Sequence, residues 1–427
     1  MNMKTIEYKN IDEVMHTYEH KSGLKCFVIP KKGYSKKFAT FATHYGSINN
    51  EFIIPGETDA TRVPDGIAHF LEHKLFEQKD GSVMDKFSQL GSNPNAYTSF
   101  AQTAYLFSCT DKFEENLALL LDFVQNPYIT EESVEKEKDI IGQEIRMYDD
   151  NANWRVFFNL LGAFYEKNPV RIDIAGSIES ISKINKDILY KCFNTFYHPS
   201  NMVIVIVGDV DAALVFEQIE KGINVSSSKP EIKRIFPDES DKVYKSYVEQ
   251  KLAVSMPLFQ MGFKDSGFKS KGMDCLMRET AVKILLDMIV GKSSKLYNDL
   301  YNEGLINSSF EFDYSIEENY AYSVLGGESK EPMKVKDRLL EEIKNIHDKG
   351  LNEEIYERIR RANKGRLVKQ FNSVDKIAHN FVSVYFKEIN LFDYMEVYDK
   401  ITFEYVSRVF KEHFSADKLA MSVINPV

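Results

Sequence analysis

The chain twice runs from a helix-like segment into an apolar strand, first as Ile188-Leu-Tyr-Lys-Cys-Phe-Asn-Thr-Phe-Tyr197 followed by Met202-Val-Ile-Val-Ile-Val207. The second copy lies 217 residues later and reads Tyr405-Val-Ser-Arg-Val-Phe-Lys-Glu-His-Phe414 followed by Leu419-Ala-Met-Ser-Val-Ile424. The same shift places the strand-like Tyr105-Leu-Phe-Ser on Tyr322-Ser-Val-Leu. Several matches at one offset indicate an internal duplication, so we expect two domains with one fold.

A polar segment with two prolines, from Ser226 to Ser240, separates the copies and is typical of a linker. We therefore expect a first domain at 1–225, a linker at 226–242 and a second domain at 243–427. Strand-like and helical segments are grouped rather than strictly alternating, which favours an α+β class with an antiparallel sheet and helices on one face of it. The first copy is expected to have strands at 23–29, 37–44 and 96–109. Its helices are expected from about Asp65, whose side chain can cap the first, at 116–123, and from 132 to about 165.

Composition excludes several classes of protein. The 427 residues are 43% hydrophobic and carry a net charge of −10, which fits a folded protein and argues against nucleic acid or anionic membrane as the main partner. A run of about 18 apolar residues and a secretory signal are both absent from the sequence, so we expect a cytoplasmic protein that does not cross a membrane. The four cysteines form no CxxC pair and are expected to be reduced and buried.

The segment Gly66-Ile-Ala-His-Phe-Leu-Glu-His73 carries the chemistry. In a helix, His69 and His73 lie on one face with Cβ atoms about 5–6 Å apart and can share one metal ion. Glu72 borders that face and could take a proton from a water molecule that the metal activates. This is the His-x-x-Glu-His order of the inverzincins.

A second copy of the same letters, His16-Thr-Tyr-Glu19-His20, stands between strand-like segments. In a strand, residues four apart are separated by roughly 13 Å and cannot share an ion. We therefore expect metal at the later motif and none at the earlier one.

A catalytic zinc ion usually has three protein ligands and one open position. Glu137 and Glu144 are seven residues apart in a helical segment and therefore lie on one face. Glu144 could complete a site of two histidines and one glutamate, with Glu137 supporting it from outside the ligand shell. Read without a relative, both could equally be ordinary solvent-exposed glutamates of a helix.

Together, Gly66–His73 and Glu137-Lys-Asp-Ile-Ile-Gly-Gln-Glu144 resemble the pitrilysin/insulinase family of metallopeptidases, which includes half-size bacterial members. The agreement extends through Asn95-Ala-Tyr-Thr98, the segment from Asn168 to Ile181, and the segment from Ser293 to Gly304. It covers essentially the whole chain. The resemblance implies a zinc endopeptidase that hydrolyses short or unfolded peptides.

By this resemblance, His69, His73 and Glu144 are the zinc ligands and Glu72 is the general base. Glu137 matches a second acidic position of the catalytic set. Asn95 and Ala96 match a strand whose edge pairs with the substrate backbone. A shift of 217 residues carries the four motif positions onto residues that cannot form this site, so we expect one zinc ion per chain; these residues are Leu286, Ile289, Val290 and Arg361.

One departure from the family concerns partners. Many longer relatives have an arginine and a tyrosine that reach over the substrate, whereas Leu300-Tyr-Asn-Glu-Gly-Leu-Ile-Asn-Ser308 offers Tyr301 and Asn307 and no arginine. We therefore expect a heterodimer with a zinc-less, half-size paralogue, and a homodimer is the other arrangement considered. The alternative functions are a non-catalytic scaffold and a peptide-binding subunit, which metal analysis and binding assays separate from an enzyme.

Overall fold

The structure is a computed structural model that describes residues 3–224, 231–268 and 270–427. The chain divides into two compact units. Unit 1 comprises Met1–Ile145, Asp173–Phe236 and Val368–Phe386, and unit 2 comprises Arg146–Ile172, Pro237–Leu367 and Lys387–Val427. Residues 226–230 of the expected linker lie outside the described residues. The expected domains at 1–225 and 243–427 are continuous stretches of sequence, whereas each compact unit combines several stretches, so the expected boundaries stay a prediction.

Unit 1 is built on a seven-stranded sheet with the order β1-β2-β3-β11-β4-β10-β9. Its neighbouring strands are antiparallel except for the parallel pair β3 and β11. The strands of this sheet are β1 (Lys4–Tyr8), β2 (Glu13–Glu19), β3 (Lys25–Pro30), β4 (Lys37–Thr43), β9 (Asn93–Thr98), β10 (Thr103–Cys109) and β11 (Met202–Gly208). Two small sheets accompany it, formed by β5 (Glu51–Ile53), β6 (Ala60–Arg62) and β12 (Lys233–Arg234), and by β7 (Glu77–Gln78) and β8 (Gly81–Ser82).

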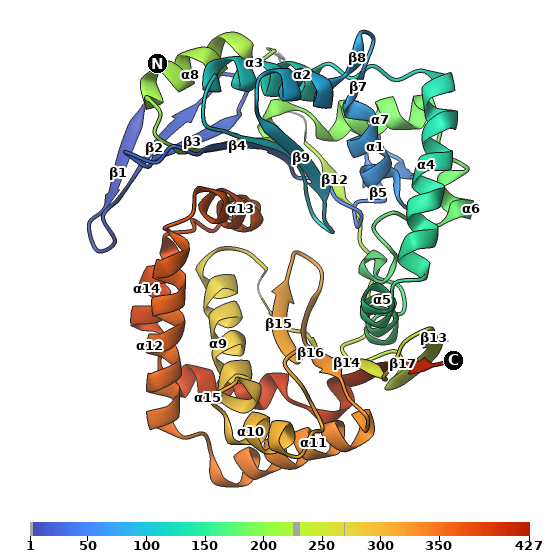
Figure 1. Cartoon of the computed structure of the whole chain (residues 1–427), viewed down its shortest axis with the longest axis vertical. Helices are drawn as coiled ribbons and strands as arrows, with labels where there is room; N and C mark the ends of the chain where they lie inside the picture. The colour runs from blue at the N-terminus through green and yellow to red at the C-terminus, as the bar shows by residue number, and fades with distance from the viewer. Residues whose placement is uncertain (1–2, 225–230, 269) are drawn as a thin grey trace. The chain divides into compact units, whose positions relative to one another are not determined.

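Helices cover both faces of the unit 1 sheet. Helices α3 and α8 pack on one face and α13 packs on the other, against β4 and β11 (Figure 1). The helices of unit 1 are α1 (Ile67–Leu75), α2 (Val83–Gln89), α3 (Phe113–Gln125), α4 (Glu131–Asp149, whose last residues belong to unit 2), α6 (Ile178–Ile181), α7 (Lys186–Phe196), α8 (Ala212–Gly222) and α13 (Val374–Tyr385). Because β11 is central and covered on both faces, every residue in it is buried, which explains its uninterrupted apolar sequence.

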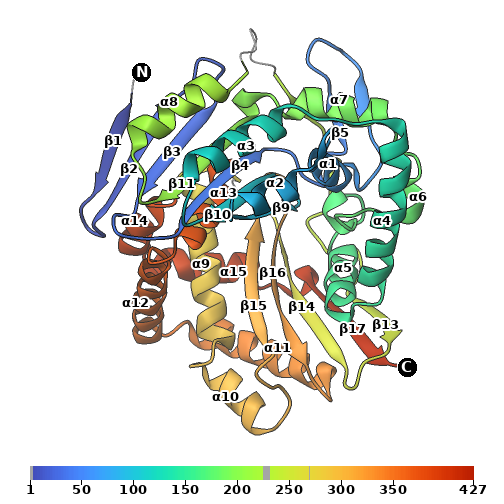
Figure 2. The same cartoon turned by 45° about the horizontal axis from the view of Figure 1, so that its top comes forward.

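Unit 2 is built on a five-stranded sheet with the order β13-β17-β14-β16-β15 (Figure 2). Its strands are β13 (Tyr247–Leu252), β14 (Leu258–Asp265), β15 (Glu311–Ile316), β16 (Ala321–Glu328) and β17 (Leu419–Pro426). Its helices are α5 (Ala152–Phe164), α9 (Gly272–Val290), α10 (Lys295–Asn302), α11 (Pro332–Lys349), α12 (Glu353–Gln370), α14 (Asp393–Lys400) and α15 (Phe403–His413). Short 3-10 turns stand at Pro169–Arg171, Pro199–Asn201 and Ala416–Lys418.

The predicted duplication is confirmed by the topology. The order β13-β17-β14-β16-β15 repeats β3-β11-β4-β10-β9, with the parallel pair at the same place in both sheets. Helix α7 and the turn after it recur in α15 and its turn at the predicted shift of 217 residues. The α+β class with two similar domains is therefore correct.

The two units exchange one helix each. Helix α5 comes from the first half of the chain but packs on β14 and β17 of unit 2, whereas α13 comes from the second half and packs on the sheet of unit 1. The expectation of helices on one face of each sheet is thus incomplete. The opposite face of each sheet receives a helix from the other half of the sequence.

Two local expectations were wrong. The helix expected from 132 to about 165 is divided into α4 and α5, because Asn151 caps α5 by accepting a hydrogen bond from the Trp154 amide at 3.1 Å. The strand expected over 96–109 is a hairpin of β9 and β10. All four cysteines are free and buried, as expected. Among the described residues, no helix is long and apolar enough to cross a membrane.

A charged cluster is buried in the core of unit 2. Arg278 donates to both oxygens of Asp265 at 2.7 and 2.9 Å, and the Tyr314 hydroxyl donates to Asp265 at 2.7 Å. His413 Nδ1 lies 3.4 Å from the same carboxylate. Burial raises the pKa of Asp265, but His413 and Arg278 outweigh it and hold the pKa well below its usual range. The cluster therefore contains an ionised carboxylate at neutral pH.

We expect Asp265→Asn to lower the free energy of unfolding by about 3 kcal/mol at pH 7, because it leaves the buried Arg278 without its main counter-charge. The depressed folded-state pKa means that the carboxylate stabilises the fold above about pH 4 and that this stabilisation is lost as pH falls further. Urea titrations at pH 7 and pH 3 should show the difference between wild type and variant shrinking at pH 3. The matched control is Asp313→Asn, whose side chain is 71% exposed. An equal loss in both variants would contradict the assignment.

Candidate metal centre

Two glycines seat helix α1. Gly66 precedes the helix with φ +89°, and a Cβ there would lie 2.3 Å from the carbonyl oxygen of Ala175. Gly176 has φ +75°, and its Cβ would lie 2.5 Å from the oxygen of Asp65. Only glycine permits this backbone contact and these dihedral angles. The start of α1 is thereby fixed against the segment from Asp173 to Ser177.

Asp65 does not cap α1, contrary to expectation. Its Oδ1 accepts from Asn50 at 2.8 Å and from Arg62 at 3.2 Å, and the helix begins after Gly66 with no side-chain cap. Gly66, in the left-handed backbone conformation, occupies the N-cap position, so Asp65 lies one residue too early to cap the helix.

The structure brings His69, His73 and Glu144 together. Glu144 Oε2 lies 3.7 Å from His69 Nε2 and 3.6 Å from His73 Nε2, and one ligand atom from each of the three residues lies within 4.8 Å of the others. His69 and His73 come from α1 and Glu144 comes from α4. Figures 1 and 2 show α1 between β9 and α4.

This donor set fits zinc. A tetrahedral ion with Zn–N and Zn–O bonds of about 2.0–2.1 Å separates its ligand atoms by roughly 3.4 Å, slightly less than the two nitrogen–oxygen distances here. Two imidazoles and one carboxylate are the ligand types of catalytic zinc sites that keep a fourth position open. A small inward movement of the three side chains would suffice to hold the ion.

The two imidazoles differ in their surroundings. Burial and the neighbouring His73 lower the pKa of His69 to about 4, so His69 is neutral and able to bind metal at neutral pH. Burial also lowers the pKa of His73, but the hydrogen bond to Glu137 and the nearby carboxylates outweigh it and raise the pKa. His73 Nδ1 lies 3.0 Å from Glu137 Oε1, whereas His69 Nδ1 is buried with no hydrogen-bond partner among the described residues.

Glu72 lies beside the cluster and is held by a residue that the sequence did not single out. The Thr98 hydroxyl donates to Glu72 Oε2 at 2.6 Å. Burial raises the pKa of Glu72 above its ordinary value, although the bond from Thr98 lowers it in part. Thr98 is the last residue of β9. Its contact with Glu72 depends on how β9 crosses α1, and the spacing of residues in the sequence does not reveal this crossing.

Asn95 and Ala96 lie on β9, the last strand of the unit 1 sheet. They pair with Leu106 and Tyr105 of β10, so the opposite edge of β9 is not covered by a strand of that sheet. The Ala96 amide donates to the Asn95 side-chain oxygen at 2.9 Å. Strand β9 is therefore an edge strand of this sheet, and its pairing with a peptide, implied by the family resemblance, stays a prediction.

The earlier motif lies where its sequence predicted, in and after a strand. His16 is in β2 and its Nδ1 lies 2.9 Å from the Thr5 hydroxyl. His20 follows the strand and its Nδ1 lies 2.7 Å from the Ser22 hydroxyl. The two imidazoles thus have separate partners.

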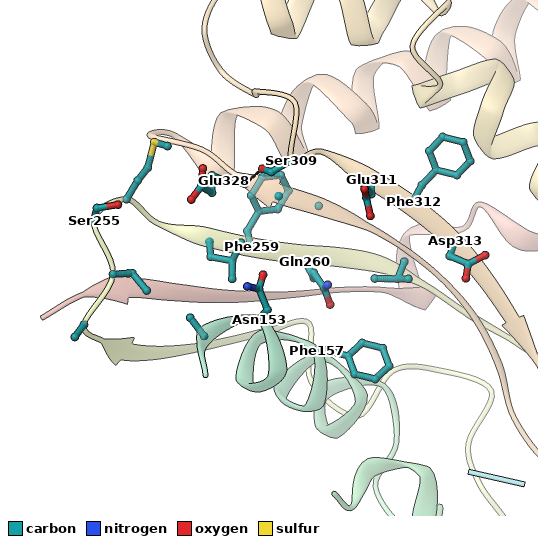
Figure 3. Close-up of a pocket in the computed structure, with 18 residues that line it drawn as sticks. Asn153, Phe157, Ser255, Phe259, Gln260, Ser309, Glu311, Phe312, Asp313 and Glu328 are labelled. Carbon is teal, nitrogen blue, oxygen red and sulfur yellow. Dashed lines mark hydrogen bonds between the residues drawn. The ribbon is translucent and has the colours of Figure 1, made fainter. Parts of the chain in front are cut away.

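In the second repeat, three of the four positions that correspond to the motif are apolar and buried, and the fourth is an exposed arginine. Leu286, Ile289 and Val290 are buried in α9, and Arg361 pairs with Glu357 on α12 at 3.7 Å. Unit 2 has instead a cavity of about 710 Å³ along β14, β15 and β16 and the start of α5. Figure 3 shows Glu311, Asp313 and Glu328 around it. None of the described residues that line it is a histidine or a cysteine.

Comparisons with known proteins match both halves of the chain. The family model "Insulinase (Peptidase family M16)" matches residues 53–177, which include the whole metal cluster. The model "Peptidase M16 inactive domain" matches residues 183–363. The second description agrees with the absence of histidine and glutamate at the shifted motif positions in the sequence.

One relative and one solved structure match at least 99% of the chain, and another relative matches part of it. YmfH of Bacillus subtilis (strain 168), named as an uncharacterized zinc protease, is 43% identical over 429 residues, with 99% of each chain covered. The crystal structure of an M16-like peptidase from Alicyclobacillus acidocaldarius is 34% identical with a TM-score of 0.93, covering 100% of this chain and 99% of that one. The mitochondrial-processing peptidase subunit beta of Caenorhabditis elegans is 31% identical over 40% of this chain and 38% of its own length.

We expect Thr98→Val to lower kcat for the predicted peptide hydrolysis about 10-fold, because Glu72 loses a hydrogen bond to its charged form. The zinc content should not change, since the hydrogen bonds of the Thr98 side chain lead to Glu72 and Thr103, neither of which is a candidate ligand. Steady-state kinetics and metal analysis measure the two effects. Thr98→Ser keeps the hydroxyl and should retain most activity; a Val variant as active as wild type would remove Thr98 from the site.

Proposed function

Since the chain belongs to peptidase family M16, the insulinase family, we propose that it is a zinc-dependent endopeptidase that hydrolyses short or unfolded peptides. The observation that carries this proposal is the convergence of His69, His73 and Glu144 with Glu72 beside them. All four residues lie within the part of the chain that matches the peptidase model.

His69, His73 and Glu144 would hold one zinc ion. When bound, zinc polarises the peptide carbonyl and lowers the pKa of water toward about 7. Glu72 takes the proton from the attacking water and delivers it to the leaving amine. Its raised pKa suits this exchange, because a base with a pKa nearer to neutrality releases the proton again more readily. Thr98 fixes the orientation of Glu72, and Glu137 fixes that of His73.

We propose that the substrate binds as an added strand on β9. Backbone pairing with Asn95 and Ala96 would align the peptide by hydrogen bonds that do not depend on its sequence. The Asn95 side chain now accepts the Ala96 amide, and it would release this amide to the substrate. A binding mode based on the backbone favours extended peptides over folded proteins.

The alternative is a scaffold or a peptide-binding subunit without catalysis. The inactive-domain description applies to residues 183–363 and not to the metal cluster. A scaffold has no requirement for two histidines, a glutamate and a hydroxyl-oriented carboxylate in one place. The intact set therefore favours the enzyme.

We further propose that a second chain completes the substrate site. The two positions that correspond to the family's arginine and tyrosine are occupied by Tyr301 and Asn307, so the arginine is missing. Tyr301 on α10 is 50% exposed, and the Asn307 side chain donates to Glu328 at 2.8 Å. A zinc-less, half-size paralogue carrying the arginine and the tyrosine would supply this pair, and a homodimer is the simpler possibility. The relative from Caenorhabditis elegans is likewise named as one subunit of a peptidase.

We expect Glu72→Gln to retain stoichiometric zinc while kcat falls by roughly 10²–10⁴-fold, because the amide cannot accept the proton. Glu144→Gln should instead lose zinc together with activity. Removal of metal with a chelator should abolish hydrolysis by wild type, and added zinc should restore it. Metal analysis and cleavage of a quenched fluorescent peptide measure these outcomes.

The matched control is Glu135→Gln on the same helix as Glu144. Glu135 has a side chain that is 70% exposed and pairs with Lys138, so this variant should match wild type in zinc content and rate. Full activity of Glu72→Gln would exclude the proposed mechanism, and wild type without zinc or hydrolysis would favour the scaffold.

We expect the purified chain alone to cleave peptides slowly and a zinc-less, half-size paralogue to raise kcat/KM by about 10-fold or more, on the scale of one lost transition-state contact. Activity is measured against increasing amounts of the paralogue at a fixed concentration of this chain. Ordinary rates for the isolated chain, unchanged by the paralogue, would rule out the need for a heterodimeric partner.

A further inference from the structure

Lys74, the residue that follows His73, is fully buried, with no exposed surface. Its ammonium group forms a short contact with Glu77 and donates to the Ser133 carbonyl oxygen at 3.3 Å. It also lies 3.8 Å from Glu137 Oε2. Lys74 thus lies against Glu137, the carboxylate that contacts His73.

Stability alone does not account for a lysine here. A buried ion pair is weak evidence of stabilisation, because replacing the whole pair by apolar residues of similar volume is often neutral or stabilising. The rest of α1 is apolar apart from the motif residues, so a methionine would suit the surroundings. A buried cation at this place therefore points to a role in the neighbouring site.

The contacts of Lys74 join the two helices that carry the candidate ligands. Ser133 and Glu137 are four residues apart on α4 and therefore share a face, and Glu144 lies further along the same helix. Lys74 on α1 contacts both Ser133 and Glu137. The two oxygens of Glu137 are consequently directed to different partners, with Oε1 3.0 Å from His73 Nδ1 and Oε2 facing Lys74.

The other imidazole provides a comparison within the same site. His69 Nδ1 has no hydrogen-bond partner among the described residues, so no carboxylate holds that side of the ring. His73 is the imidazole whose orientation depends on a carboxylate, and that carboxylate is the one next to Lys74. Partners of this kind affect metal affinity, and their removal usually costs 10–100-fold.

We propose that Lys74 is a positioning residue of the metal centre, which fixes Glu137 against His73 and α1 against α4 so that the ligand atoms of His73 and Glu144 stay together. The proposal rests on the proposed zinc site. The proposal predicts whether zinc affinity rises or falls when Lys74 is replaced. A cation near a bound divalent ion would weaken binding by repulsion, so simple removal of charge should tighten binding, whereas loss of positioning should weaken it.

The test is Lys74→Met in the full chain, with zinc affinity measured by competition with a chromophoric chelator. We expect an affinity about 10-fold weaker than that of wild type. The melting temperature of the metal-free variant should fall, because the buried Glu137 loses the cation beside it. Lys74→Gln, which keeps a donor for Ser133 but lacks the charge, is measured alongside and should also bind zinc more weakly.

The matched control is Lys264→Met. Lys264 is another buried lysine, 2% exposed, and belongs to unit 2, where it donates to the carbonyl oxygens of Phe164 at 3.0 Å and Lys242 at 3.2 Å. Its partners Phe164, Lys242 and Glu239 all belong to unit 2, and none of them is a candidate ligand. Its removal should change stability without changing zinc affinity.

A double-mutant cycle with Glu137→Gln tests whether Lys74 acts through Glu137. If it does, Lys74→Met adds little to the loss of affinity already caused by Glu137→Gln. Equal or tighter zinc binding by Lys74→Met, or fully additive losses in the double variant, would overturn the proposal. A wild-type chain that binds no zinc would instead remove the proposed function, and the role of Lys74 with it.

Discussion

Both units depend on burying the two faces of a central strand. Strand β11 in unit 1 and strand β17 in unit 2 are flanked by strands on both sides, and their residues are almost all buried. A sheet whose central strand is apolar on both faces needs a layer on each face. Each repeat supplies one layer from its own helices, and α13 and α5 supply the other layer from the opposite half of the sequence. This requirement explains why the compact units interleave although the repeats are contiguous.

Helix α1, which carries the metal motif, is also largely buried, but several of its buried side chains are polar. Most of α1 is buried, including His69 and Glu72, so its polar groups must find partners inside the protein. Thr98 donates to Glu72, Glu137 holds His73 Nδ1, and a metal ion would bind the Nε2 atoms of the two imidazoles. In the second repeat, the corresponding positions in α9 are Leu286, Ile289 and Val290, which need no such partners. The same three apolar residues of α9 therefore account both for the missing metal ligands and for the apolar packing of this helix in the second repeat.

The sequence was sufficient for the features that follow from periodicity and local geometry. The repeat could be predicted because apolar strands and their preceding helices recur at one offset, and the pairing of His69 with His73 follows from helical spacing. The contact of Glu144 with both histidines needed the family resemblance, since it joins two helices that are distant in the chain. The exchange of α5 and α13 was missed, because an amphipathic helix does not specify which sheet it will cover. Thr98 and Lys74 were missed for a similar reason. Their roles come from contacts across elements, and a buried lysine has the same letter as an exposed one.

The two repeats also show that a buried polar group has no single meaning. His413 ends α15 in unit 2 and lies beside the Asp265–Arg278 pair, whereas Phe196 ends α7 at the corresponding place in unit 1 and stacks on Tyr45 with ring centroids 4.0 Å apart. One fold therefore accepts either an ionic or an aromatic core at this position, as expected when a fully paired ionic cluster and a well-packed apolar one have similar stability. Arg278, Tyr314 and His413, which hold Asp265, all belong to unit 2, whereas the metal cluster belongs to unit 1. Lys74 differs in that its ammonium touches the carboxylate that holds a candidate ligand. The contacts of a buried charge, more than its burial, thus distinguish a structural role from a functional one.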